Sequence, residues 1–362
     1  MDFQRFGVIS DTHNVDWSVI EQIVAEFKSR GVDLILHCGD IMPQHLDAKL
    51  FGDFPVICAL VANQPQIPEY VFSPAGWAFT RPDDRVVNLG TMRVYVGHQR
   101  SIDFLLKSEQ DLRRIIDEIH KRHDGLRIMV AGHTHHQILV EDDPVLFINP
   151  GAAMGGYDGY EFALIDLEKK EVIFSRIPLT PSHADPFTIG VISDTGNIME
   201  RDENFWFQLA EEFRRRDVSQ VIHCGNIWSN DIGRQEFAGF NVFCYLGDDQ
   251  VNKFSDPKPK NWHIVSKNNP IVEINGYRFY IEYSLGVDFF ERSEYSMSMF
   301  SRQLSKQYHH IDFVLCGLIH SALYEEGDEV TIINPGDARK RRKFVTICLP
   351  RNEVTFGSVS IG

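Results

Sequence analysis

Residues 128–136 read Ile-Met-Val-Ala-Gly-His-Thr-His-His, and the rest of the chain is best interpreted from this stretch. The apolar run 126–131 predicts a β-strand, because it is rich in β-forming residues and stops at Gly132. His133 and His135 follow where the strand gives way to a loop. Paired imidazoles are typical ligands of late first-row metal ions, and a glycine lets backbone and ligand pack closely. Because Gly-His-x-His alone is a weak signal, its meaning depends on ligands elsewhere.

Four other apolar runs also end in side chains that bind metal ions. The runs and the residues that follow them are 6–10 with Asp11 and His13, 32–38 with Asp40, 54–61 with Asn63, and 92–96 with His98. Sites in open α/β sheets gather beyond the carboxyl ends of the strands. The sequence therefore predicts that these residues converge in space with His133 and His135.

The ordered set D-x-H, G-D, N, H and G-H-x-H resembles the calcineurin-like metallophosphoesterases. Asn149-Pro150-Gly151 resembles the small bacterial and archaeal phosphodiesterases of that superfamily, and the resemblance covers about residues 5–175. It implies an α/β/β/α sandwich, with two mixed sheets flanked by helices, and a dinuclear metal centre. Carried over residue by residue, it implies that Asp40 bridges the two ions. The other ligands of one ion would be Asp11, His13 and His135, and those of the second ion would be Asn63, His98 and His133.

The resemblance also implies the chemistry. Two divalent ions, manganese first and iron, zinc or nickel as alternatives, would activate a bridging water that attacks a small phosphate ester. Asp40, Asn63 and His98 are the catalytic residues implied. The sequence departs from the family where Gln64-Pro65 replaces the usual His or Cys-Asp, and where Gln99-Arg100 replaces Gly-His. No acid for the leaving group is identified, so we expect weak activity or activity confined to good leaving groups.

The whole pattern occurs twice. Asp194 matches Asp11 at an offset of 183 residues, and Asn334 matches Asn149 at an offset of 185. A nearly constant offset indicates duplication of one domain. We therefore expect a first domain over residues 1–178, a proline-spaced linker over 179–186 and a second domain over 187–362.

The second copy has lost much of the ligand set. The matched residues are Asp194, Gly196, Asn226, Asp248, Tyr283, Leu318 and His320. Glycine, tyrosine and leucine replace three histidines, and neutral Asn226 replaces the bridging aspartate. We expect a pseudo-enzyme copy that stabilises the chain, dimerises or covers the active site, as in the degenerate phosphoesterase folds that serve as interaction surfaces. The basic run 339–343 is expected to form a solvated turn or a face that contacts an acidic partner in a dimer, with a phosphate or nucleic-acid contact as the alternative.

The bulk composition limits the function classes. The chain has 362 residues, 43% of them hydrophobic, which suits two globular domains. A net charge of −15 argues against a dedicated nucleic-acid binder. The sequence has no apolar run of about 18 residues and begins with a polar segment, so neither a membrane span nor a signal peptide is expected. Six isolated cysteines indicate buried free thiols and a cytoplasmic location.

Two functions from different classes remain. The first is a metal-dependent phosphoesterase, most naturally a phosphodiesterase, that acts through residues 1–178 on a small phosphate ester. The second is a non-catalytic binding or scaffold protein in which residues 1–178 hold metal without turnover, and residues 187–362 meet a protein partner or a second copy. A protein serine/threonine phosphatase is disfavoured, because Asp40 is followed by Ile-Met-Pro instead of Arg-Gly.

Helices are expected at 16–30, 109–123, 204–216 and 294–309.

Overall fold

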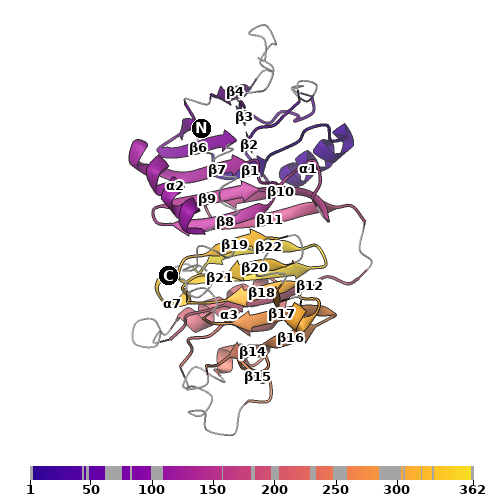
Figure 1. Cartoon of the computed structure of the whole chain (residues 1–362), viewed down its shortest axis with the longest axis vertical. Coiled ribbons are helices and arrows are strands. Elements are labelled where there is room, and N and C mark those ends of the chain that lie inside the picture. Colours follow the sequence, from indigo (N-terminus) through magenta and orange to yellow (C-terminus); the bar gives the residue numbers. More distant parts are fainter. Residues whose placement is uncertain are drawn as a thin grey trace. The chain divides into compact units, whose positions relative to one another are not determined.

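The chain forms two compact units in this computed structural model, Met1–Ser182 and His183–Gly362 (Figure 1). Their boundary falls inside the proline-spaced segment 179–186. The structure describes residues 3–42, 45, 49–61, 76–81, 84–98, 109–156, 158–180, 184–196, 204–228, 234–247, 259–284, 303–304, 306–318, 320–327 and 330–359.

Unit 1 contains two mixed sheets. The first has the strand order β11-β10-β1-β2-β3-β4 and the second β8-β9-β7-β6-β5. Parallel pairing of β1 with β2 and of β2 with β3 brings the carboxyl ends of these strands to one edge. The elements are β1 Arg5–Ile9, α1 Trp17–Ser29, β2 Leu34–His37, β3 Val56–Ala59, β4 Trp77–Thr80, β5 Val86–Leu89, β6 Met92–His98, α2 Glu109–Arg122, β7 Leu126–Gly132, β8 Gln137–Asp142, β9 Val145–Pro150, β10 Gly159–Asp166 and β11 Glu171–Pro178.

A helix covers the outer face of each sheet of unit 1. Helix α1 packs on β10 and β11, and its Phe27 ring meets Phe162 edge to face at 5.4 Å between centroids. Asp16 caps the helix as expected, because its side chain accepts a hydrogen bond from the Ser18 amide at 2.8 Å. Helix α2 packs on β8 and β9. The two sheets meet through β3 with β6 and β9 with β10, which gives the expected α/β/β/α sandwich.

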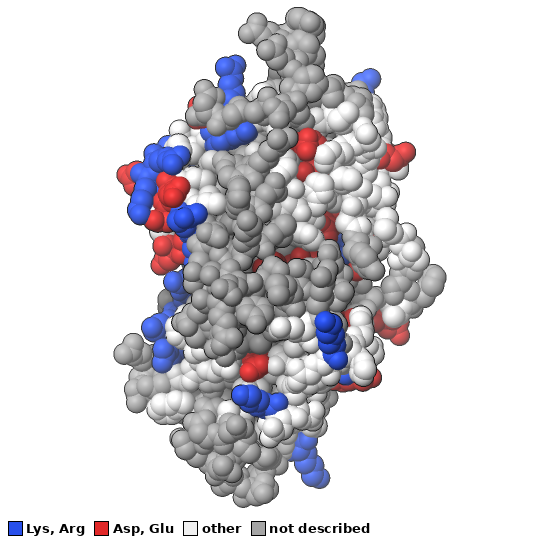
Figure 2. Space-filling view, viewed as in Figure 1, with Lys and Arg blue, Asp and Glu red and all other residues white. Residues whose placement is uncertain are grey.

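The solvent face of α2 carries both signs of charge. Lys121 lies 2.5 Å from Asp117, and Arg122 lies 3.9 Å from Glu118, each one helical turn apart. Figure 2 shows acidic and basic side chains side by side over this region of unit 1. Among the described residues, no helix has both the length and the apolar character needed to cross a bilayer.

Unit 2 repeats the architecture, with strand orders β15-β14-β13-β12-β21-β22 and β16-β17-β18-β20-β19. Helix α3 packs on β13, and much of the helix expected at 294–309 lies outside the described residues. The elements are β12 Phe187–Ile192, α3 Phe205–Arg215, β13 Val218–His223, the 3-10 helix η5 Gln235–Phe237, β14 Asn241–Tyr245, β15 Trp262–Val265, β16 Ile271–Ile274, β17 Tyr277–Glu282, β18 Phe313–Cys316, β19 Leu323–Glu326, β20 Thr331–Asn334, α7 Ala338–Arg341, β21 Lys343–Leu349 and β22 Glu353–Ser358.

Several local expectations are decided by this fold. All six cysteines are free and five are buried, with Cys348 partly exposed. Three residues of the basic run 339–343 lie in α7, which is capped by the Asp337 side chain. Within that run, the guanidinium of Arg342 bonds the amide oxygen of Gln208 and lies over the ring of Phe205. Part of the run therefore anchors α7 to α3.

Candidate metal centre

The predicted ligands of unit 1 are presented by turns in left-handed backbone conformation. The φ angles are 52° at Asp11, 37° at His13, 55° at Asp40, 101° at His133 and 61° at His135. Non-glycine residues rarely adopt positive φ, and each instance costs about 1–3 kcal/mol. Such turns directly after β1, β2 and β7 aim successive side chains at one point. The equivalent residues of unit 2, Asp194, Asn226 and Leu318, also have positive φ angles, so these turns belong to the fold that both units share.

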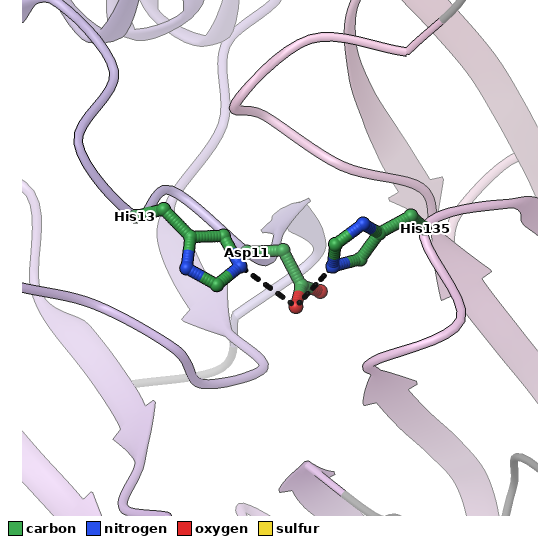
Figure 3. Close-up of side chains that lie close together, drawn as sticks. All are labelled: Asp11, His13 and His135. Carbon is green, nitrogen blue, oxygen red and sulfur yellow. Dashed lines mark ion pairs between the residues drawn. The ribbon is translucent and has the colours of Figure 1, made fainter.

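Asp11 is the buried centre of this arrangement. Its Oδ2 accepts hydrogen bonds from the Ser10 hydroxyl at 2.6 Å and from the His133 amide at 3.0 Å. Its Oδ1 is also buried but has no hydrogen-bond partner among the described groups. Around Oδ1 lie the Nε2 atoms of His135 at 3.2 Å, His13 at 3.8 Å and His98 at 3.9 Å. Figure 3 shows the rings of His13 and His135 on either side of the carboxylate.

The charge environment keeps Asp11 ionised. Burial acts to raise its pKa, but the nearby His135 and His98 and the hydrogen bond from Ser10 outweigh burial and lower the pKa to about 2. The His135 nitrogen is close to Oδ1 without being aligned for a hydrogen bond. Asp11 therefore offers a charged and otherwise unused oxygen at neutral pH.

Asp40 lies on the other side of the same imidazoles. Its Oδ2 is 3.5 Å from His13 Nε2 and 3.7 Å from His98 Nε2. Two sets of ligand atoms are thus compact enough to hold an ion, Asp11 with His13 and His135, and Asp11 with Asp40 and His98. Ligands about 2.0–2.2 Å from one ion lie about 3–4 Å from each other, which is the spacing found here.

His98 is held in the form that binds metal. Its Nδ1 lies 3.1 Å from the Cys38 carbonyl, which only accepts, so Nδ1 carries the proton and Nε2 keeps its lone pair. Burial lowers the pKa of His98, although Asp11 and Asp40 act in the opposite direction, so the ring is neutral at pH 7. His98 Nε2 is also 3.1 Å from His133 Nδ1.

The buried His37 connects the turn that carries Asp11 to the turn that carries Asp40. The Gly39 amide donates to His37 Nδ1 at 3.2 Å, so His37 Nε2 bears the proton and reaches the Thr12 hydroxyl at 3.2 Å. Unit 2 repeats this bridge with His223, which supports the interpretation of His37 as structural. A Cβ at Gly39 would lie 2.6 Å from the Cβ of His98, so only glycine fits there.

Six of the seven predicted ligands lie within the described residues, and the structure brings them together. Asn63 lies outside them, as do Gln64-Pro65 and Gln99-Arg100. The sequence singled out Asp40 as the shared ligand, whereas the structure places both Asp11 and Asp40 within 4 Å of His13 and His98. The supporting groups Ser10 and the Cys38 carbonyl were missed. The only signal for Ser10 was the Ile-Ser-Asp repeat in both copies.

The corresponding place in unit 2 is closed by hydrogen bonds. Asp194 Oδ1 accepts from the Tyr283 hydroxyl at 2.8 Å and from the Asn226 amide at 3.0 Å. Burial, assisted by Asp194, raises the pKa of Tyr283, so the phenol stays a donor. His320 Nδ1 is 3.8 Å from Asp194 Oδ1, Leu318 offers no ligand atom, and Asp248 lies outside the described residues.

Comparison with known proteins agrees with the fold and the motifs. The calcineurin-like phosphoesterase superfamily domain matches residues 5–170 and again residues 187–351. The chain therefore belongs to this superfamily, and the family predicted from the sequence is confirmed.

Individual relatives each match about half of the chain. A phosphodiesterase of Methanocaldococcus jannaschii is 25% identical over 177 residues, which cover 46% of this chain and 95% of that protein. A solved structure described as a novel archaeal phosphodiesterase covers 48% of this chain and 99% of its own, with 20% identity and a TM-score of 0.36. The structure of vacuolar protein sorting 29 from Cryptosporidium parvum covers 49% of this chain and 93% of its own, with 20% identity and a TM-score of 0.37.

Proposed function

We propose that unit 1 is a metal-dependent phosphodiester hydrolase with two divalent ions, and that unit 2 is a non-catalytic copy. Superfamily membership supports metal-dependent hydrolysis of a phosphate ester, and the archaeal relative named as a phosphodiesterase supports a diester substrate. The proposed ligands are Asp11, His13, Asp40, Asn63, His98, His133 and His135.

The observation that carries this proposal is that the buried Asp11 Oδ1 has no hydrogen-bond partner among the described groups. This oxygen is charged and buried, and it lacks a hydrogen-bond donor among the described groups, although three imidazole nitrogens lie within 3.9 Å. Leaving a buried polar atom unsatisfied costs about 1–3 kcal/mol, and more when it is charged. A cation between the carboxylate and the imidazoles removes that cost. Mixed nitrogen and oxygen donors suit manganese, iron, zinc or nickel.

The residues of unit 1 have distinct proposed roles. When bound, the two ions supply a water of lowered pKa as the nucleophile and neutralise the phosphate oxygens. Asp11 and Asp40 balance the charge of the ions, and the Cys38 carbonyl orients His98. The side chains of His13 and His135 are 31% and 43% exposed, whereas that of His98 is only 2% exposed. The substrate therefore approaches from the side of His13 and His135.

The proposed inactivity of unit 2 follows from the hydrogen bonds of Asp194 Oδ1, the atom equivalent to Asp11 Oδ1. Asp194 Oδ1 already accepts two hydrogen bonds, from Tyr283 and Asn226, where Asp11 Oδ1 has none from the described groups. A neutral amide in place of Asp40 also bridges two dications poorly. We expect unit 2 to bind no dinuclear centre.

The test combines activity with metal content. Hydrolysis of bis-p-nitrophenyl phosphate is measured with added Mn²⁺ for the full chain, for Asp40→Asn and for the matched unit 2 variant Asn226→Asp. We expect two ions per chain and turnover, both lost in Asp40→Asn and unchanged in Asn226→Asp. Metal bound without turnover of any diester favours the scaffold function, and a chain that binds no divalent metal refutes the proposal.

A further inference from the structure

A buried arginine ties together two strands that lead to proposed ligands in unit 1. Arg85 is only 6% exposed. Its Nη2 donates to the Leu60 carbonyl at 2.6 Å, and its Nη1 lies 3.4 Å from both the carbonyl and the hydroxyl of Thr80. A guanidinium presents several donors in a rigid plane, so it can hold two acceptors at a fixed separation.

The hydrogen bonds of Arg85 connect the two sheets of unit 1. Leu60 directly follows β3 and Thr80 ends β4, both in the first sheet, whereas Arg85 directly precedes β5 in the second. The Arg85 carbonyl also accepts from the Val96 amide at 2.9 Å, and the Thr80 hydroxyl donates to the Val96 carbonyl at 2.8 Å. Val96 precedes His98 by two residues. Arg85 and Thr80 therefore join the end of β3 to the end of β6.

Unit 2 provides an internal comparison for this bridge. The main-chain bonds are retained, because Leu246 donates to Val265 at 3.0 Å as Leu60 does to Thr80 at 3.0 Å. Ile281 donates to the Pro270 carbonyl at 2.8 Å, in the place of the bond from Val96 to Arg85.

The polar side chains of the bridge are absent from unit 2. Valine stands in place of Thr80 and proline in place of Arg85, and neither can donate a side-chain hydrogen bond. The fold of unit 2 forms without the bridge, so the sandwich does not require it. The copy that lacks the bridge is also the copy in which His98 is replaced by Tyr283.

We infer that Arg85, together with Thr80, is a positioning residue that fixes the end of β6, which carries His98, a ligand proposed for one of the two ions. This inference rests on the proposed metal centre. Asp11, His13 and His135 come from β1 and β7, so the bridge acts on one ion of the pair and leaves the other in place.

The test measures how the two ions bind. Mn²⁺ is titrated calorimetrically into the metal-free full chain and into the variants Thr80→Val and Arg85→Lys. Thr80→Val introduces the residue that unit 2 carries, and Arg85→Lys keeps the charge but replaces the planar fork of separate donor nitrogens with a single nitrogen. We expect one ion to bind as in the wild type and the other to bind about 10–100-fold more weakly, the usual effect of removing a group that orients a ligand.

Arg93→Ala is the matched control. Arg93 is on β6, the strand that carries His98, and its guanidinium bonds the Asp124 carbonyl in an exposed position. This variant should bind both ions as the wild type does. The inference is overturned if both ions bind normally to Thr80→Val and Arg85→Lys, or if both ions weaken equally together with a loss of thermal stability. A wild-type chain that binds no ion defeats the proposed function itself, and the inference with it.

Discussion

Gly132→Ala should damage the metal centre of unit 1 although Gly132 is not a ligand. A Cβ at this position would lie 1.8 Å from Ser10 Oγ and 2.7 Å from Asp11 Oδ2, whereas real Cβ contacts are not shorter than 3.0 Å. The new methyl group and the Ser10 hydroxyl must therefore separate by at least a further 1.2 Å, the difference between 3.0 and 1.8 Å. Metal–ligand distances tolerate only about 0.2 Å. Asp11 cannot then keep both its bond from Ser10 and its place among the imidazoles.

We expect Gly132→Ala to lower the free energy of unfolding by about 1–3 kcal/mol through overpacking, and to weaken Mn²⁺ binding by about 10–100-fold. Unfolding is measured in denaturant with a chelator present, and binding is measured by calorimetry. Gly317→Ala is the matched control, because its Cβ would lie 2.2 Å from Ser193 Oγ in unit 2. It should destabilise the chain similarly and leave metal affinity unchanged. Normal Mn²⁺ affinity in Gly132→Ala refutes the role given to the Ser10–Asp11 bond.

Three further predictions concern stability, each measured by denaturant unfolding of the metal-free chain. Tyr283→Phe removes one of two donors to the buried Asp194 and should cost about 1–3 kcal/mol, while metal content stays unchanged; an unchanged stability contradicts the account of the closed site. Burial lowers the pKa of His223 from 6.5 to about 4, so the unfolded ring binds a proton before the folded ring does. His223 alone should contribute a loss of about 1.4 kcal/mol per pH unit as the pH drops from 6.5 to 4, and His223→Gln should reduce the slope of the chain by that amount; the same slope in the variant would contradict the assignment. Gly7→Ala places a Cβ 2.6 Å from the Phe27 ring and should cost about 1–3 kcal/mol without affecting the Asp194 site.

The sequence by itself determined the class of protein and the identity of the candidate ligands. The duplication is visible as a nearly constant offset between equivalent residues such as Asn149 and Asn334. The loss of ligands in the second copy is visible as Leu318 and Tyr283 in histidine positions. Helix α1 was also predictable, because its apolar spacing and its cap at Asp16 are local features. Each of these properties depends on residue type and on short spacing along the chain.

Only the tertiary structure decided how the side chains at the site are oriented and satisfied. Asp11 Oδ2 accepts a hydrogen bond from the amide of His133, which is 122 residues away in the sequence, and Oδ1 has no donor among the described groups. Arg85 reaches Leu60 across 25 residues and between the two sheets of unit 1. Such contacts are made by groups whose separation in sequence carries no periodic signal. They arise only when the folded strands bring those groups within hydrogen-bond distance.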